Sequence, residues 1–328
     1  MEYVVVDFEW NQSSRPGHSS GRLPFEIIEI GAVKLDEDLR EIGRFSRTVR
    51  PKVYKKLHYM TRELTGISQQ ELDGSDPFPY VLVYFMLWCG NDFIFCTWGN
   101  TDLVELQRNM RYFNLEDLLV GPIRYYNVQK LFRIFFQPQR QAASLESAAE
   151  LLEISGEGDF HRAVNDAAYT AKILQRMDPQ QADRFFSVDY YQYPRSREEE
   201  IHLTYEDHYK YISRDFPDKE AALADREVRA MHCYMCGRAV RQKIRWFSGR
   251  SRFWFCLAWC PEHGWIRGKI RIKHTDTGRV LAVKTIRMID EGQAAALREM
   301  KTDMARRRRE KRHKDHEDPS GGAQSGSV

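Results

Sequence analysis

The stretch Tyr3-Val4-Val5-Val6-Asp7-Phe8-Glu9 begins the chain as a hydrophobic run that ends in two carboxylates separated by one residue. The apolar run predicts a buried strand, and residues two apart on a strand point to the same side of a sheet. Asp7 and Glu9 are therefore expected to converge at the strand end, where their oxygens suit a divalent cation. An Asp-x-Glu triplet alone is a weak signal, because such triplets are common on protein surfaces.

The pattern that follows predicts an α/β domain over residues 1–177. Strands are expected at 26–35, 44–49 and 93–97, and helices at 78–88, 101–112, from 144 onward and at 164–177. Strands followed by helices alternating with strands indicate a mixed sheet flanked by helices. Residues 178–231, rich in Tyr, Asp, Glu and Pro, are expected to form a connecting region that is partly helical.

A second, smaller module is expected in the C-terminal part of the chain. Residues 232–288 contain four strand-like segments and a turn signal at Asp276-Thr-Gly278, which predicts a small all-β module. A basic helix is expected over 289–314. The final segment, 315–328, is small and polar in composition and is expected to be a disordered tail.

The charge distribution suggests two separate tasks. The net charge is +3, but residues 238–314 contain 22 Lys and Arg against 7 Asp and Glu, while residues 1–237 carry a net charge of −9. Carboxylates can hold cations, and clustered cations can hold a polyanion. No stretch approaches the ~18 uncharged apolar residues of a membrane span. We therefore expect a cytoplasmic protein with no membrane partner, and the sequence leaves its protein partners unknown.

Three further residues suit phosphodiester chemistry. Asp102 follows the expected strand at 93–97, and His161 and Asp166 flank the expected start of the last helix. Residues five apart in a continuous helix point ~140° apart, so His161 is expected before the helix and Asp166 in its first turn. Two Mg²⁺ or Mn²⁺ ions held by carboxylates can clamp a phosphodiester, and a neutral histidine suits a general base.

In order and context these residues resemble the motifs of the DEDD-h exonucleases, the superfamily of ribonuclease T, oligoribonuclease and the proofreading subunit of bacterial replicative polymerase. Asp7 and Glu9 match its first motif, Asp102 its second, and His161 with Asp166 its third. Other segments are similar to the branch containing histone-mRNA 3′ exonucleases and KapD-like proteins, namely residues 25–31, 49–51, 64–67 and 76–82. The resemblance covers residues 1–177.

This resemblance implies an RNase H-like fold and 3′→5′ removal of nucleotides with two metal ions. Asp7 would bridge both ions, Glu9 and Asp166 would complete the tighter site, Asp102 would hold the second ion, and His161 would activate the attacking water.

The resemblance also implies contacts with the terminal nucleotide. These would come from Phe8, from the main chain around Trp10, and from Leu64 as a wedge against the terminal base. Trp10 stands where many relatives have a small residue. Its indole either narrows the nucleotide site or packs in the core, and the sequence leaves both readings open.

Four of the six cysteines lie within 28 residues, which favours a metal over disulfides. Cys233-Tyr-Met-Cys236-Gly and Cys260-Pro-Glu-His263-Gly form two tight turns separated by 23 residues. Two such turns predict a zinc ribbon with one structural Zn²⁺ ion. Cys256 lies in an apolar strand and is expected to serve packing, although the sequence does not exclude it as a ligand.

Alternating basic and aromatic residues in the predicted C-terminal strands favour a nucleic-acid partner. The separate ribbon and the resemblance to the histone-mRNA exonuclease branch favour RNA over DNA. A rival interpretation makes the ribbon a protein–protein module. The sequence also leaves open a DNA-directed exonuclease of proofreading or repair, and a non-catalytic nucleic-acid-binding protein on the same fold.

Overall fold

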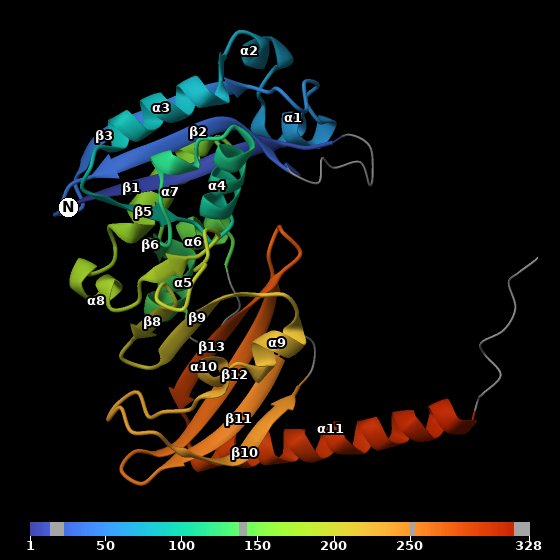
Figure 1. Cartoon of the computed structure of the whole chain (residues 1–328). Helices are drawn as coiled ribbons and strands as arrows, with labels where there is room; N and C mark the ends of the chain where they lie inside the picture. Colours follow the sequence, from blue (N-terminus) through green and yellow to red (C-terminus); the bar gives the residue numbers. More distant parts are fainter. Residues whose placement is uncertain (14–22, 138–142, 250–252, 318–328) are drawn as a thin grey trace, which may run out of the picture. The chain divides into compact units, whose positions relative to one another are not determined.

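The computed structural model describes residues 1–13, 23–137, 143–249 and 253–317. They form two compact units, Met1–Gln192 and Tyr193–Val328, each built on its own sheet (Figure 1). None of the helices in these ranges combines the length and apolar character that crossing a membrane requires.

The first unit contains a seven-stranded sheet in the order β4-β3-β2-β1-β5-β6-β7. β1 pairs antiparallel with β2 and parallel with β5, so the sheet is mixed, as predicted. The strands are β1 (Glu2–Asn11), β2 (Glu26–Leu35), β3 (Glu41–Arg50), β4 (Asp76–Pro77), β5 (Phe93–Thr97), β6 (Ile123–Asn127) and β7 (Ser187–Asp189).

Helices cover both faces of this sheet. One face carries α3 (Phe78–Cys89) and α4 (Asp102–Tyr112), and α3 runs along the strands β1 to β3 (Figure 1). The other face carries α5 (Val128–Phe136), α6 (Leu145–Leu151) and α7 (Ala163–Leu174). The short elements of the unit are α1 (Tyr59–Thr65), α2 (Gln69–Asp73), the 3₁₀ turn η1 (Glu116–Leu118) and α8 (Pro179–Asp183).

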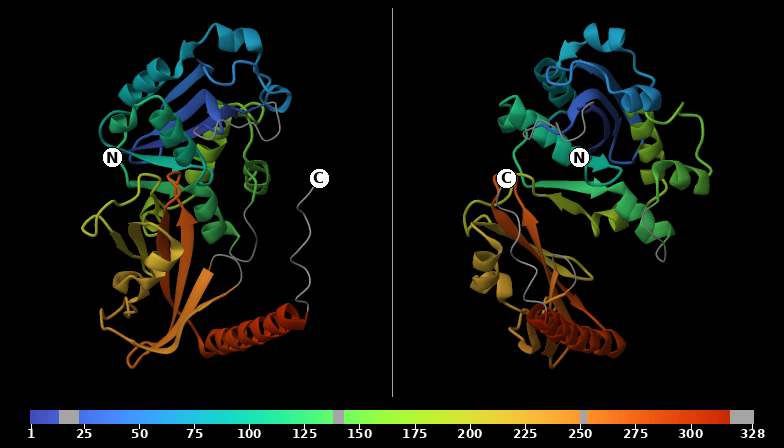
Figure 2. Two further views of the ribbon diagram at one scale, coloured as in Figure 1. Left: turned by 45° about the vertical axis from the view of Figure 1, so that its right-hand side comes forward. Right: turned by 90° about the vertical axis from the view of Figure 1, so that its right-hand side faces the viewer.

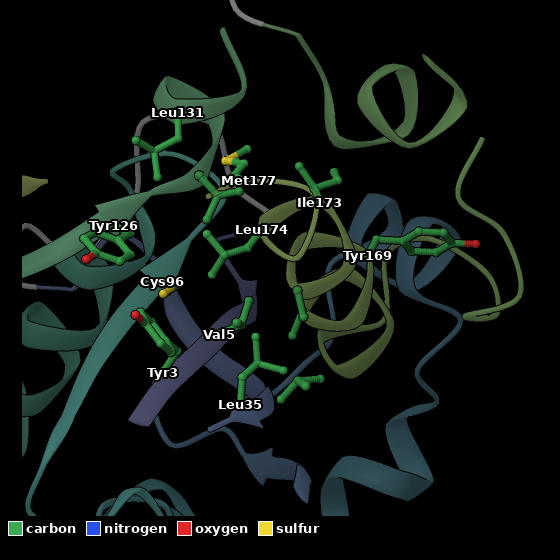
Figure 3. Packing of buried hydrophobic residues seen from close by; sticks show 14 of the residues in the cluster. Tyr3, Val5, Leu35, Cys96, Tyr126, Leu131, Tyr169, Ile173, Leu174 and Met177 are labelled. Atoms are coloured by element: carbon green, nitrogen blue, oxygen red, sulfur yellow. The ribbon is translucent and has the colours of Figure 1, made fainter. Parts of the chain in front are cut away.

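β1 is apolar on both sides because it lies in the middle of this three-layer arrangement. Tyr3 and Val5 pack toward α7, whereas Val4 and Val6 pack toward α3 and α4. Figure 3 shows Val5 beside Leu174 of α7 on the first of these faces. A strand buried on both faces reads as a continuous apolar run rather than an alternating one.

The second unit contains a six-stranded sheet in the order β10-β11-β12-β13-β9-β8. Its strands are β8 (Ile201–Thr204), β9 (Tyr209–Phe216), β10 (Arg241–Ser248), β11 (Phe253–Cys260), β12 (Gly264–His274) and β13 (Val280–Met288). The helices α9 (Lys219–Ala224) and α10 (Arg226–Arg229) contribute Ala222 and Val228 to the core of this unit.

The expected connecting region, 178–231, supplies strands to both sheets. β7 pairs with β6 in the first sheet, and β8 and β9 extend the second sheet beyond the four strands expected from the pattern. The division between the units falls after Gln192, later than the expected end of the first domain at 177. The predicted helical part at 218–230 is present as α9 and α10, which Asp225 separates.

The basic segment forms a long helix, α11 (Glu291–Glu317). Its first turns pack on the sheet through Ala294 and Leu297, which contact Ile244 and Leu257. Figures 1 and 2 show the rest of α11 (red) extending beyond the strands of its own unit. Most of the tail expected to be disordered, from residue 318 onward, lies outside the described residues.

Candidate active site

Asp7 and Glu9 lie on the part of β1 that extends beyond its pairing with β5. The β1–β5 pairing runs from Glu2 to Val5, so the two carboxylates follow the last paired residue. On the other side of β1, Asp7 lies opposite Gly31 and Glu9 opposite Glu29. The Asp7 and Glu9 side chains therefore lie on the same face of the sheet, because side chains alternate along a strand.

α7 begins directly over this face. A Cβ atom at Gly31 would lie 2.0 Å from the backbone nitrogen of Val164 and 2.1 Å from the carbonyl carbon of Ala163. Only glycine leaves room for the first turn of α7 at this distance. This close approach brings Asp166, in the first turn of α7, beside the carboxylates of β1.

His161 precedes α7, as predicted, and has a left-handed backbone with φ of 65°. This conformation is uncommon for a residue with a side chain and is found at functional sites. The His161 N–H donates to both carboxylate oxygens of Asp166 at 3.3 Å. The His161 ring lies with its Nε2 atom 3.5 Å from Glu146 Oε1. One possible ligand atom from each of Glu9, His161 and Asp166 falls within 4.8 Å of the others.

Asp102 reaches the site from the opposite layer. It is the first residue of α4, which follows β5, and its side chain is only 5% exposed. Glu105, in the same turn, is also buried and forms an ion pair with Arg108. The carboxyl ends of parallel neighbours such as β1 and β5 lie at the same edge of a sheet, which explains why Asp102 meets Asp7 there.

The electrostatics of these carboxyl groups fit a cation site. Burial raises the pKa of Asp7 well above its usual range, and repulsion from Asp102 and Glu9 adds to this effect. Burial likewise raises the pKa of Glu9 to about 8, of Asp102 to about 7 and of Asp166 to about 6. Four such groups ionise together only with a compensating positive charge, and hard oxygen donors suit Mg²⁺ or Mn²⁺.

Sequence reasoning missed two side chains that hold this arrangement. Glu29 is fully buried on β2, and Arg162 Nη2 donates to its Oε1 atom at 2.8 Å. Glu146 faces the ring of His161. A charged residue inside the apolar run of residues 26–35 was the available signal for Glu29. Glu146 had no such signal, because it stands in an ordinary amphipathic helix.

The three residues predicted to contact the substrate differ in how exposed their side chains are. Phe8 is 2% exposed and packs edge-on against Phe85 in the core. Trp10 packs against the same core cluster and lies 5.8 Å from Phe25, ring centre to ring centre. Leu64, in α1, is 54% exposed, whereas Trp10 is half-buried and Phe8 is buried. The Phe8 side chain is therefore taken up by packing in the core.

The predicted zinc ligands come together in the second unit. Cys233 Sγ lies 3.5 Å and Cys260 Sγ 3.7 Å from His263 Nδ1, and Cys236 Sγ lies 3.8 Å from Cys260 Sγ. A tetrahedron with Zn–S bonds of about 2.3 Å has S···S edges of about 3.8 Å. The four donors therefore have the spacing and chemistry of a structural zinc site.

The local turns explain this geometry. Gly237 and Gly264, which follow the two ligand pairs, have φ angles of 70° and 85° that favour glycine. Cys256 is fully buried among apolar side chains and lies outside the group of four possible ligands. Its position agrees with the predicted packing role.

Comparison with known proteins identifies the first unit. A family model described as an exonuclease matches residues 4–174, about half of the chain. The chain belongs to this exonuclease family. The predicted membership of the DEDD-h exonucleases and the predicted RNase H-like α/β class are thereby confirmed.

The exonuclease domain is similar to several curated proteins. It is 34% identical over 174 residues to the PolC-type DNA polymerase III of Clostridium perfringens, and 28% identical over 176 residues to the probable 3′-5′ exonuclease KapD of Bacillus subtilis. It is 27% identical over 188 residues to 3′-5′ exoribonuclease 1 of Rattus norvegicus. These matches cover 53%, 53% and 54% of this chain, and 11%, 83% and 53% of the respective relatives.

Among solved structures, the nuclease domain of 3′hExo, a DEDDh family member, matches with a TM-score of 0.49 and 24% identity. The match covers 57% of this chain and 96% of that domain.

Proposed function

We propose that this protein is a metal-dependent 3′→5′ exonuclease that acts on single-stranded RNA ends. The observation that carries the proposal is the convergence of Asp7, Glu9, Asp102 and Asp166, from three elements, beside His161. All four carboxyl groups have raised pKa values, which is the condition of an acidic cluster that binds cations.

The proposed roles follow from position. Repulsion from Asp102, Glu9 and Asp166 all raises the pKa of Asp7, so Asp7 is near each of the other three carboxylates, which suits a carboxylate shared by two ions. Two divalent ions in such a cluster would offset the charge of the attacking and leaving oxygens. The burial of Asp102 keeps bulk water from screening the site.

His161 is the proposed general base. Its ring is nearly half exposed, so a water molecule can reach it, and Glu146 lies 3.5 Å from its Nε2 atom. A proton accepted at Nε2 would be stabilised by the Glu146 carboxylate, as a carboxylate stabilises an imidazolium in other acid–base pairs. The hydrogen bonds from the His161 N–H to Asp166 fix the backbone position from which the imidazole ring extends.

Leu64 is the proposed contact to the terminal base. Met60, one helical turn earlier, is also exposed, so the two apolar side chains form one surface on α1. Asn11 anchors the segment before α1, because its side chain donates to the carbonyls of Tyr54 and Lys56 and accepts from the His58 N–H. A fixed α1 can hold an apolar wedge against a base.

RNA is favoured over DNA because several of the relatives are named exoribonucleases. The polymerase relative, at 34% identity, supports DNA as the alternative substrate. A metal-dependent assay with 5′-labelled single-stranded RNA and matched DNA separates the two, and the 5′ label reports the polarity of shortening.

The matched variants are Asp7→Asn and Asp92→Asn. Asp92 is an exposed carboxylate before β5, at the opposite end of that strand from Asp102. We expect a ladder that shortens from the 3′ end, faster on RNA, unchanged in Asp92→Asn and lost in Asp7→Asn. If the protein shortened DNA faster than RNA, DNA would take the place of RNA as the proposed substrate. Intact strands with every metal would overturn the proposed activity.

A further inference from the structure

One face of the second sheet is strongly basic. Along β12, Ile266, Ile270 and Ile272 point into the core that α9 and α10 complete. The residues between them point to the opposite face, because side chains alternate along a strand. Those residues include Arg267, Lys269 and Arg271, which stand about 7 Å apart in succession.

The neighbouring strands add to this face. Across from β12, Phe253 of β11 pairs with Arg271, and Arg287 of β13 pairs with Arg267. Lys269 Nζ lies 4.1 Å from the centre of the Phe253 ring, and Arg271 is 5.8 Å from it. We name these five residues the basic face: Phe253, Arg267, Lys269, Arg271 and Arg287.

The cations of the basic face repel one another. In the part of the chain that the structure describes, Arg287 has an acidic partner, Asp207 at 2.8 Å, but Arg267, Lys269 and Arg271 form no ion pair. Burial lowers the pKa of Lys269, and repulsion from Arg267 and Arg271 lowers it further. Burial also lowers the pKa of Arg267, with Arg287 as the repelling charge. An anion on this face would relieve the repulsion.

α11 occupies a different part of the same side of the sheet. It packs on Ile244 of β10 and Leu257 of β11, and Arg298 lies 4.6 Å above the ring of Trp265 at the start of β12. Arg271 and Arg287 remain exposed. The helix therefore borders the basic face and adds positive charge beside it without burying these two side chains.

We infer that the basic face binds the phosphate backbone of single-stranded nucleic acid upstream of the 3′ end that is cleaved. The occupant is a polyanion because three cations that form no ion pair within the described ranges repeat along one strand, and the phosphates of an extended single strand can follow this repeat. Phe253 provides an aromatic surface beside the cations. The choice of nucleic acid as the polyanion rests on the proposed function.

The test measures binding of the full-length protein in an Asp7→Asn background, where the labelled strand is not shortened. A 5′-fluorescent single-stranded RNA 20-mer and the matched DNA are titrated at several salt concentrations. The variant is Lys269→Gln with Arg271→Gln. The matched control is Lys219→Gln with Arg226→Gln, which removes the same charge from exposed residues of α9 and α10 on the opposite face.

We expect the basic-face variant to bind about fivefold or more weakly, and the slope of log K against log salt to fall by about 1.4, since each phosphate contact on a single strand contributes about 0.7. The control should change neither. If the double variant fails to fold, Arg271→Gln alone, at an exposed side chain, should lower the slope by about 0.7.

Equal binding and equal slopes in the variant and its control would overturn the inference, and would make an acidic protein segment the alternative occupant. Cleavage of a trinucleotide separates this result from the proposed function. If a trinucleotide is shortened equally by the parent and by Lys269→Gln with Arg271→Gln in a chain that retains Asp7, the proposed activity stands whatever the binding result. If the basic-face variant bound more weakly but the parent protein cleaved nothing, the inference about the basic face would stand and the proposed nuclease activity would be rejected.

Discussion

Arg162 and Glu29 join the start of α7 to the centre of the first sheet. Arg162 donates through Nη2 at 2.8 Å and Nε at 3.1 Å to Oε1 of Glu29, whose other oxygen accepts from the Ala163 N–H at 3.1 Å. Glu29 is fully buried and lies opposite Glu9 in the sheet. The Arg162–Glu29 pair therefore helps to position His161 and Asp166, which lie before and after Arg162 in the chain and act in the proposed chemistry.

Replacing Glu29 with Gln should loosen this connection. The buried charge-assisted hydrogen bonds contribute about 1.5–3 kcal/mol, so the free energy of unfolding of the first unit should fall by about that amount. A shift of α7 should also reduce kcat about tenfold or more with little change in KM. Denaturant unfolding and steady-state cleavage measure the two effects.

The matched control is Asp38→Asn, which breaks the ion pair with Arg40 on the surface. Both side chains there are more than half exposed, so the loss should stay below about 1 kcal/mol. If Glu29→Gln kept full kcat and full stability, the pair would not position α7.

Replacing Gly31 with Ala should displace α7. The new Cβ atom would meet the backbone of Val164 at 2.0 Å, and backbone cannot rotate away as a side chain can. We expect about a 100-fold loss of kcat, because a shift of about 1 Å in the first turn of α7 separates Asp166 from the other carboxylates. Gly43→Ala in β3 is the control, since its Cβ would find its nearest neighbour, in Trp88, at 3.7 Å. Equal activity of the two variants would contradict the close-approach argument.

The carboxylate cluster predicts how metal-free stability depends on pH. The folded pKa values of Glu9, Asp102 and Asp166, at about 8, 7 and 6, lie above the ordinary range near 4. Protons thus bind the folded state more tightly, and this stabilisation is lost as pH rises from about 4 through 8. Without divalent cations, the Tm of the first unit should fall between pH 5.5 and 8.5.

Adding Mg²⁺ should restore this stability by replacing the lost protons. The gain in Tm should be larger at pH 8.5 than at pH 5.5, at roughly 2–4 °C for each kcal/mol. Asp7→Asn should reduce the gain and Asp92→Asn should not. Differential scanning calorimetry with Mg²⁺ and with K⁺ at matched ionic strength measures this gain. An equal gain in Tm at both pH values would contradict the prediction that Mg²⁺ replaces the lost protons.

Cys236→Ser should remove the zinc site and destabilise the second unit, since four ligands in two turns hold the strands β10 to β12 together at this end. We expect one Zn²⁺ per chain in the parent and less than half of that in the variant, measured by elemental analysis. Cys256→Ala should keep its zinc, because Cys256 lies in the core outside the ligand group. Trinucleotide cleavage should persist in both variants if the exonuclease domain folds without the ribbon.

Local patterns were sufficient for the long elements and the chelating turns. Residues 26–35 and 93–97 form strands with the predicted bounds, because their apolar runs suit strands buried in a sheet. The cysteine turns were equally predictable, since two residues between ligands and a glycine after them define a turn by themselves. β7, β8 and β9 were missed, because these short or polar strands depend on the partners beside them.

The sequence by itself determined the kinds of residue available: four carboxylates and a histidine in order, a zinc-binding set, and a basic strand. Only the tertiary structure decided which of them meet. Asp102 joins Asp7 because β1 and β5 are parallel neighbours, and Asp166 joins them because Gly31 lets α7 approach the sheet. The same packing turns the Phe8 side chain into the core, because adjacent residues on a strand face opposite sides.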